Sequence, residues 1–475
     1  MPSTLVARLV AITLTAGTAV LLATGASAAS WDPFETESLI AKTAPEFRPN
    51  AGVGCELPSN ALSLEKAIDL ALCRNPTTRA AWAAAQAQAA SLGASESGYL
   101  PTVTFSGGET HVEGVVQTGS TARSEQDTEN SVTALSWTLV DFNARRSEVA
   151  NARSLLLAAA HSGSATAQRT VYSVIQAYYG AMATEQAFHA NQQTEGNSAR
   201  SLEIARALQS GGAATLADVM QAETAYQQAV YQRIQSNTAA LNSRANLAVL
   251  LGFSADQALA LVPATTPSAP AVTARVSELL SLAARQRPDL AAARDQRAAA
   301  EAAVTNARAV GRPKVSLGAQ HTVNDVHLLP RANYNSVGIQ ITVPLFSGFQ
   351  THYGIRRAEA ALEEVTAQAE QSRLSVSLDV WNAFHGLEAA NQELTTSATL
   401  AKAAATNEEI AIGRYQSGVG SMLDVLTAQS AGANARIIRI QSEFNWQAAR
   451  AQMALAVGKL TSAADLDVIA PITAR

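Results

Sequence analysis

Two aspartates, Asp218 and Asp424, occupy matching places in the sequence, each shortly after a glycine-containing turn. Asp218 follows Gly211 by seven residues and Asp424 follows Gly418 by six, so both are expected in the first turns of a returning helix. An acid at a helix start is stabilised by the macrodipole, by about 0.3–1 kcal/mol. Carboxylates gathered at a constriction would instead focus a negative potential and attract cations. Both roles are open on the sequence alone.

The other chemically capable residues form no recognisable catalytic or metal site. The seven histidines lack the i, i+4 spacing of a helical metal site, and the five methionines are not clustered. No Gly-x-Ser-x-Gly elbow or phosphate-binding loop occurs. The acid pairs Glu363-Glu364 and Glu408-Glu409 are expected on solvated helix faces. We therefore expect neither an enzyme nor a bound cofactor or metal.

Composition and the N-terminus indicate an exported protein. The 475-residue chain has a net charge of −5 and a pI near 5.9, which excludes a basic nucleic-acid binder. An apolar run from Leu9 to Thr24 ends at Ala26-Ser27-Ala28, the pattern of a signal peptide over residues 1–28. The alternative is an N-terminal anchor, for which the run is short. No later stretch reaches the length of a transmembrane helix.

Cys55 and Cys73 are the only cysteines, and 17 residues separate them. This spacing does not resemble a zinc motif. An even count in an exported chain favours a disulfide, which would attach the N-terminal segment to the first short helix.

The chain contains an internal duplication. The segment Leu64–Pro76 resembles Val276–Pro288, at an offset of 212 residues. A repeat of this length indicates two related units rather than a solenoid. The predicted organisation is a signal peptide at 1–28, an N-terminal segment at 29–61, a first repeat at 62–252, a proline-containing linker at 253–273, a second repeat at 274–460 and a C-terminal tail at 461–475.

Each repeat is expected to hold two strands, and these alternate in polarity. The strands are predicted at about 102–112, 131–140, 314–323 and 335–344. The clearest apolar face consists of Val337, Ile339, Ile341 and Val343. Such alternation fits an antiparallel sheet on a soluble core, and it also fits a membrane barrel that is apolar towards lipid. Export without a helical anchor favours the barrel.

Two long helices follow the strands in each repeat. They are predicted at about 143–209 and 215–251, and again at about 349–416 and 421–457. Roughly 67 residues at 1.5 Å each give a rod on the order of 100 Å. Ile355, Leu362, Ala369 and Val376 lie seven apart, as in a coiled-coil seam. Each repeat should therefore form an antiparallel helical hairpin.

Four strands per chain cannot close a membrane barrel, since the smallest closed barrels have about eight strands. Strands must then be pooled between chains, and three chains would supply twelve. The order of elements, the duplication and the segments Pro344–Gly348 and Arg414–Gly418 resemble the TolC-type outer-membrane efflux protein family. The resemblance covers about Leu62 to Leu460.

This resemblance implies an α+β membrane protein that forms a homotrimer, with a 12-stranded β-barrel in outer-membrane lipid continued by an α-helical tunnel in the periplasm of a Gram-negative cell. It implies a passive exit duct for type I protein secretion or small-molecule efflux. The partners would be a periplasmic adaptor (membrane fusion) protein and an inner-membrane ABC transporter or proton-driven pump. The alternative is a periplasmic coiled-coil scaffold that does not span the membrane.

The resemblance also assigns roles to residues at the hairpin tips. The adaptor docking tips are Ser210, Gly211, Gly212, Ser417, Gly418 and Val419. The periplasmic aperture is assigned to Asp218, Asp424 and the latch aromatic Tyr415. Two positions depart from the family pattern, because a second aspartate falls on Thr427 and a latch arginine on Gly420. The segment Leu72–Pro76 resembles members that work in type I secretion.

Overall fold

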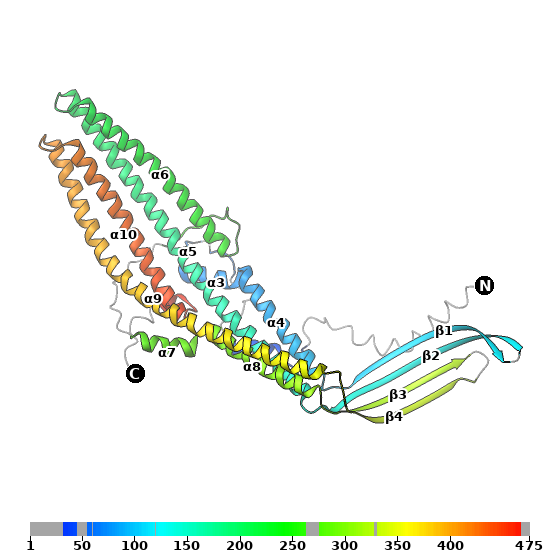
Figure 1. Cartoon of the computed structure of the whole chain (residues 1–475). Coiled ribbons are helices and arrows are strands. Elements are labelled where there is room, and N and C mark those ends of the chain that lie inside the picture. Colours follow the sequence, from blue (N-terminus) through cyan, green and yellow to red (C-terminus); the bar gives the residue numbers. More distant parts are fainter. Residues whose placement is uncertain are drawn as a thin grey trace, which may run out of the picture.

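The computed structural model describes residues 32–44, 55–58, 60–118, 120–262, 275–326 and 330–466. The predicted signal peptide lies outside the described residues, as do parts of the linker and of the C-terminal tail. The described chain forms an elongated group of helices joined at one end to a four-stranded sheet (Figure 1).

The same order of elements occurs twice along the chain. The first set is α3 (Leu64–Arg74), α4 (Pro76–Ser97), β1 (Thr102–Thr118), β2 (Ser120–Val140), α5 (Ala144–Ser210) and α6 (Leu216–Leu250). The second set is α7 (Val276–Gln286), α8 (Pro288–Ala309), β3 (Lys314–Val326), β4 (Ala332–Thr342), α9 (Gln350–Gln416) and α10 (Met422–Ala456). Helix α2 (Glu37–Thr43) precedes the first set, and a 3₁₀ turn at Ala463–Leu466 follows the second.

The long helices α5, α6, α9 and α10 begin and end within one residue of their predicted bounds. Asn143 and Phe349, with φ of 79° and 66°, immediately precede α5 and α9. This left-handed conformation turns the chain from each strand into the following helix. The two 67-residue helices contain no proline, so nothing in their sequence interrupts the hydrogen-bond ladder.

The strands form one antiparallel sheet in the order β1-β2-β3-β4. The predicted outer ends of β1 and β2 were wrong, because the pairing continues from Thr102↔Ser136 out to Thr118↔Ser120. The prediction followed apolar alternation, and the outer part of this hairpin is mostly polar. The free edges of β1 and β4 have no partner strand among the described residues.

One face of the sheet is apolar across all four strands. Directly paired residues of an antiparallel sheet share a face, so the register shows which side chains lie together. One row of the apolar face is Val103, Leu135, Ala319 and Val337, and the next is Trp137, Leu317 and Ile339. No helix or strand of the described part of the chain packs against this face of the sheet. A large exposed apolar face of this kind marks an interaction surface.

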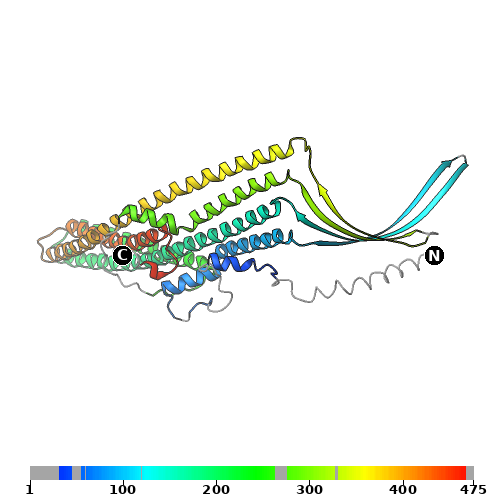
Figure 2. The ribbon, with the colours of Figure 1, turned by 90° about the horizontal axis from the view of Figure 1, so that it is seen from below.

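The helices continue the order of the strands. β1 follows α4, β2 leads into α5, β3 follows α8 and β4 leads into α9, and Figure 2 shows these four helices side by side in that order. Farther from the sheet, α5 packs against α6 and α10 (Figure 1). The chain is therefore one continuous wall, with strands at one end and helical hairpins at the other.

Each repeat contains a joint at which one helix ends against the start of another. Asn75 Nδ2, just before α4, donates to the last carbonyl of α6 at 2.8 Å. Arg287 Nη1, just before α8, donates to the last carbonyl of α10 at 3.4 Å. Gly252 and Gly458 follow these helices with φ of 82° and 79°, and a β-carbon at either would lie 2.9 Å from neighbouring backbone. The duplication thus places a glycine and a capping donor at both joints.

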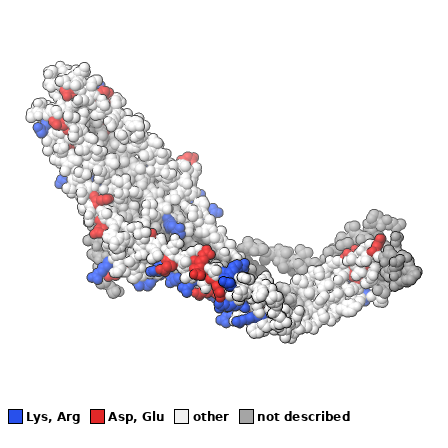
Figure 3. All heavy atoms as spheres, in the orientation of Figure 1, with Lys and Arg blue, Asp and Glu red and all other residues white. Residues whose placement is uncertain are grey.

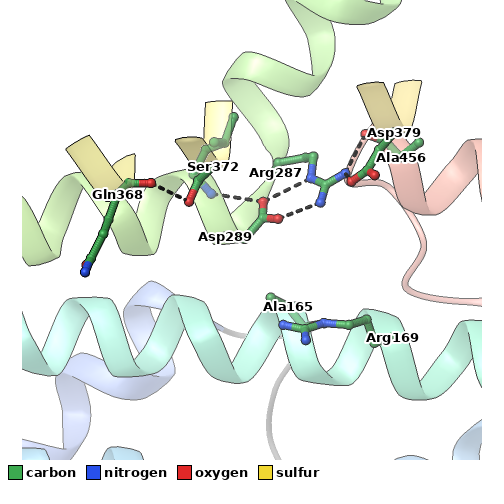
Figure 4. Close-up of polar contacts among 9 residues, drawn as sticks. Ala165, Arg169, Arg287, Asp289, Gln368, Ser372, Asp379 and Ala456 are labelled. Atoms are coloured by element: carbon green, nitrogen blue, oxygen red, sulfur yellow. Dashed lines mark hydrogen bonds and ion pairs between the residues drawn. The ribbon is translucent and has the colours of Figure 1, made fainter. Parts of the chain in front are cut away.

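The second joint also carries an ion-pair network. The Arg287 guanidinium lies between the carboxylates of Asp289, at 2.5 Å, and Asp379 on α9, at 3.0 Å (Figure 4). The equivalent residue of the first repeat, Asn75, has no charge. The joint in the second repeat is therefore tied electrostatically to its long helix.

The beginning of the predicted linker is anchored in the main core. Leu62 and Leu261 form a parallel bridge, and the Tyr178 hydroxyl of α5 lies 3.0 Å from the carbonyl oxygens of both Leu62 and Val262. The pKa of Tyr178 is raised to about 12, mainly by burial and to a smaller extent by the electrostatic effect of the neighbouring Tyr179. These contacts fix the chain on either side of the first repeat to the middle of α5.

Candidate functional site at the hairpin tips

The two helical hairpins end in glycine turns of the same form. Gly212 and Gly418 have φ of 78° and 72°, a conformation that glycine adopts without a side-chain clash. The turn after α9 closes with a hydrogen bond from Val419 N to Arg414 O at 2.9 Å. The residues predicted to dock an adaptor are all exposed in these turns: Ser210, Gly211, Gly212, Ser417, Gly418 and Val419. They are the outermost part of the hairpins (Figure 1).

Asp218 and Asp424 both close a capping box at the start of the returning helix. Thr215 N donates to Asp218 Oδ2 at 2.8 Å, and Asp218 N donates to Thr215 Oγ1 at 3.2 Å. Ser421 N donates to Asp424 Oδ2 at 3.1 Å, and Asp424 N donates to Ser421 Oγ at 3.2 Å. Each reciprocal pair satisfies donors that a helix start otherwise leaves open. Both carboxylates have a structural role, and Asp424 is exposed whereas Asp218 is partly buried.

The Asp424 carboxyl group has a pKa below the usual range for an aspartate. Its pKa is lowered by the hydrogen bonds from Ser421, with a further contribution from the positive charge of Arg414. The negative charge at this tip therefore persists in mildly acidic solution.

Tyr415 lies between the two hairpins rather than at the exposed tip. It is 6% exposed and belongs to an apolar cluster formed with residues of all four tip helices, namely Leu202, Ala205, Val219, Ala222, Met422 and Val425. Its hydroxyl has no hydrogen-bond partner among the described residues. Burial, and then the negative charge of Asp218, raise the pKa of Tyr415. The structure thus brings Tyr415 and Asp218 together, while Asp424 lies nearer Arg414.

The expectation that Glu408 lies on a solvated helix face was wrong. Glu408 is 4% exposed, and its Oε2 pairs with Arg436 Nη1 of α10 at 2.9 Å. Its Oε1 accepts from Asn197 Nδ2 of α5 at 2.9 Å. A buried carboxylate is tolerated only when paired and hydrogen-bonded, and both conditions are met. Glu408 therefore joins both helices of the second hairpin to the first hairpin.

A second polar contact continues this junction towards the tip. Gln429 Nε2 of α10 donates to Ser201 Oγ of α5 at 2.8 Å, and both residues are buried. Gly432 lies on α10 between Gln429 and Arg436. Its lack of a side chain leaves room for the Glu408 carboxylate.

The predicted lipid-facing residues project from β4 and the segment after it. The exposed fractions of Val337, Ile339, Ile341 and Val343 are 78%, 68%, 66% and 50%. Val337, Ile339 and Ile341 lie on the face shared with the apolar rows of the other strands, and Val343 follows the end of β4. Aromatic residues follow at the helix end of this face, where Phe346 and Phe349 pack edge to face with ring centres 5.6 Å apart.

Cys55 and Cys73 form a disulfide, with Cα atoms 6.2 Å apart. It attaches the segment before α3 to the last turn of that helix. Arg74 Nη1 donates to Cys55 O at 3.3 Å, which holds the same segment.

Within the described ranges, no group of three or more His, Cys, Asp and Glu side chains is placed to hold a metal ion. None of the helices in the described part of the chain has the combined length and hydropathy of a membrane-spanning helix.

The sequence profile of the outer membrane efflux protein family matches residues 67–253 and 279–459. The chain is similar to Protein CyaE of Bordetella pertussis, with 32% identity over 383 residues and 79% of each chain covered. It is also similar to the toluene efflux pump outer membrane protein TtgC of Pseudomonas putida, with 28% identity over 279 residues and 54% of each chain covered.

Solved structures share the fold. The outer-membrane channel OprN superimposes with a TM-score of 0.74 at 22% identity, covering 83% of this chain and 90% of OprN. The outer membrane protein VceC of Vibrio cholerae gives a TM-score of 0.72 at 20% identity, covering 83% of this chain and 96% of VceC.

The chain belongs to the outer membrane efflux protein family. It is an export channel protein of the outer membrane of Gram-negative bacteria. The family resemblance seen in the sequence is thereby confirmed.

Proposed function

We propose that three copies of the chain form one channel-tunnel, which serves as the passive exit duct of a tripartite export machine for type I protein secretion or small-molecule efflux. The observation that carries this proposal is the four-stranded sheet, with two free edges and one apolar face. An open sheet edge is not tolerated in hydrocarbon, so the β1 and β4 edges need partners.

Pairing β4 of one chain with β1 of the next supplies those partners. Three chains then give a closed barrel of twelve strands, with the apolar rows towards lipid and the opposite face towards water. Since the helices follow the strand order, the same threefold arrangement continues the barrel as a helical tunnel. The exposed aromatic residues Phe346 and Phe349 would lie at the periplasmic membrane boundary.

The hairpin tips form the periplasmic end of this tunnel. The exposed glycine turns would dock a periplasmic adaptor protein, which couples the duct to an inner-membrane ABC transporter or proton-driven pump. Threefold symmetry turns Asp218 and Asp424 into rings of carboxylates at the narrow end. Tyr415, packed between the hairpins, would hold the resting arrangement of the tips.

Membrane fractionation and gel mobility test this proposal. The protein is expected in the outer-membrane fraction, as a trimer on unheated gels that dissociates on boiling. The purified trimer should form ion-conducting channels in planar bilayers. A monomeric protein in the soluble periplasmic fraction would contradict the proposal and favour the periplasmic scaffold.

A further inference from the structure

The register of the sheet separates its residues into two faces, apart from one bulge at Val140↔Val315. Even-numbered residues pair with even-numbered residues across β1, β2, β3 and β4, as in Thr104↔Ala134 and Gln320↔Ser336. Odd-numbered residues pair in the same way and include the apolar rows. The even-numbered residues therefore form the polar face of the sheet.

Charged residues are distributed very unequally between the two faces. The odd-numbered face carries acidic residues and two histidines besides its apolar rows: Glu109, His111, Glu113, Asp127, Glu129, His321 and Asp325. The polar face consists of Ser, Thr, Gln, Asn, Gly and a few apolar residues. Among the strand residues whose side chains the structure describes, Lys314 is the one charged residue on this face.

Lys314 is the first residue of β3, where the sheet meets the helices. It is exposed, lies opposite Thr342 and forms no ion pair with any residue that the structure describes. On the face shown in Figure 3, Lys and Arg residues gather at this junction of helices and strands. The side chain is therefore a cation without a carboxylate partner, at the entrance to an uncharged polar surface.

We propose that Lys314 is a specificity-determining residue of the export duct, which attracts acidic polypeptide segments into the barrel. This inference rests on the proposed trimer, in which the polar face lines the lumen. Three copies of Lys314 then form a ring of positive charge where the helical tunnel meets the barrel.

The strength of screening explains why the solute would be an acidic polypeptide rather than a small anion. At physiological ionic strength the Debye length is about 8 Å, so a single charge in a wide lumen feels the ring weakly. An extended chain with several carboxylates brings several charges past the ring, so these weak attractions add up. The uncharged surface beyond the ring offers no further ionic contact, so the segment is drawn in without being retained along the barrel.

Block of single channels by poly-L-glutamate tests this role. The polymer is added at the barrel side of wild-type channels in a planar bilayer at about 0.1 M salt, where the Debye length is about 10 Å. Wild-type channels should show transient block by poly-L-glutamate. Lys314→Gln should lower the frequency of these events by about tenfold, since local charge raises the on-rate of an oppositely charged solute. Lys314→Arg should retain them.

A relocated charge provides the matched control. Ser316 lies two residues along the same face, so the double variant Lys314→Gln/Ser316→Lys should regain the block. Unchanged block in Lys314→Gln channels of normal conductance would overturn the role of Lys314 and leave the proposed duct intact. Failure of the double variant to regain the block would equally contradict a lumenal ring. If the wild-type protein forms no channels, the proposed function and this inference both fall.

Discussion

The carboxylate of Glu408 on α9 occupies the space on α10 into which a side chain at position 432 would project. A β-carbon added at Gly432 would collide with Glu408 Oε2 and lie 3.3 Å from its Cδ. Glycine inside a helix costs roughly 0.5–1 kcal/mol relative to alanine. Helix α10 is thus intrinsically less stable at this position, and the missing side chain leaves space for the buried ion pair between Glu408 and Arg436 within the second hairpin.

Gly432→Ala is expected to lower the free energy of unfolding by about 1–3 kcal/mol, because the new β-carbon displaces the Glu408 carboxylate. In a Glu408→Ala background the same substitution should be neutral or stabilising, since alanine is the better helix former. A double-mutant cycle from denaturant unfolding followed by circular dichroism measures this coupling. Substitution of the exposed neighbour Glu409 by Ala is the control. Additive effects of the two substitutions would contradict the contact.

Asp424→Asn should shift the reversal potential of the channel towards non-selectivity and weaken block by multivalent cations added at the tip side. Asparagine keeps a side-chain oxygen that can accept from Ser421 N, so the substitution removes the charge while preserving the cap. Because the pKa of Asp424 is lowered, the wild-type selectivity contributed by Asp424 should persist as the pH falls through the ordinary aspartate range, about pH 4. If the ion selectivity and the cation block of the Asp424→Asn variant match those of the wild type, Asp424 acts only as a helix cap.

Ile341→Arg should prevent normal assembly in the outer membrane, at a cost of roughly 2–4 kcal/mol if the residue lies near the bilayer midplane. Gln340→Arg is the matched control, since it places the same charge one residue away on the polar face. The amount of heat-modifiable trimer in the outer-membrane fraction measures both effects. Equal assembly of the two variants would exclude lipid contact at Ile341.

Peptide mapping of the non-reduced protein should recover Cys55 and Cys73 in one linked species. The loop-entropy model assigns a bridge of this span roughly 3 kcal/mol. The double variant Cys55→Ser/Cys73→Ser should therefore unfold at lower denaturant concentration. Two free thiols in protein prepared without reductant would contradict the bridge.

The raised pKa of Tyr178 predicts that the folded protein loses stability at alkaline pH. Its pKa is raised to about 12 in the folded chain, mainly by burial, against about 10 in an unfolded chain. The folded state therefore retains the proton more strongly, and this contribution is complete below pH 10 and is lost as the pH rises towards 12. Unfolding free energies of wild type and Tyr178→Phe across this range should converge with rising pH. A constant difference would show that the hydroxyl does not titrate in this way.

The long helices could be predicted closely because their limits are local in the sequence. Thr215 and Ser421 with their paired aspartates start α6 and α10, and glycine turns precede them. The outer ends of β1 and β2 could not be predicted, because backbone pairing continues there without apolar alternation. The burial of Glu408 was missed for a different reason. We expected it to be exposed to solvent only because its side chain is charged. It lies seven residues before Tyr415, and that heptad spacing was the available signal.

The regular pairing of even-numbered with even-numbered and odd-numbered with odd-numbered residues limits how this chain can change in length. Within the described strands the one register shift falls between Thr138 and Val140, next to the turn into α5. A single inserted or deleted residue elsewhere in a strand would exchange its two faces and carry apolar side chains to the polar side. Insertions and deletions between relatives should therefore fall in the connections or occur in pairs of residues within strands.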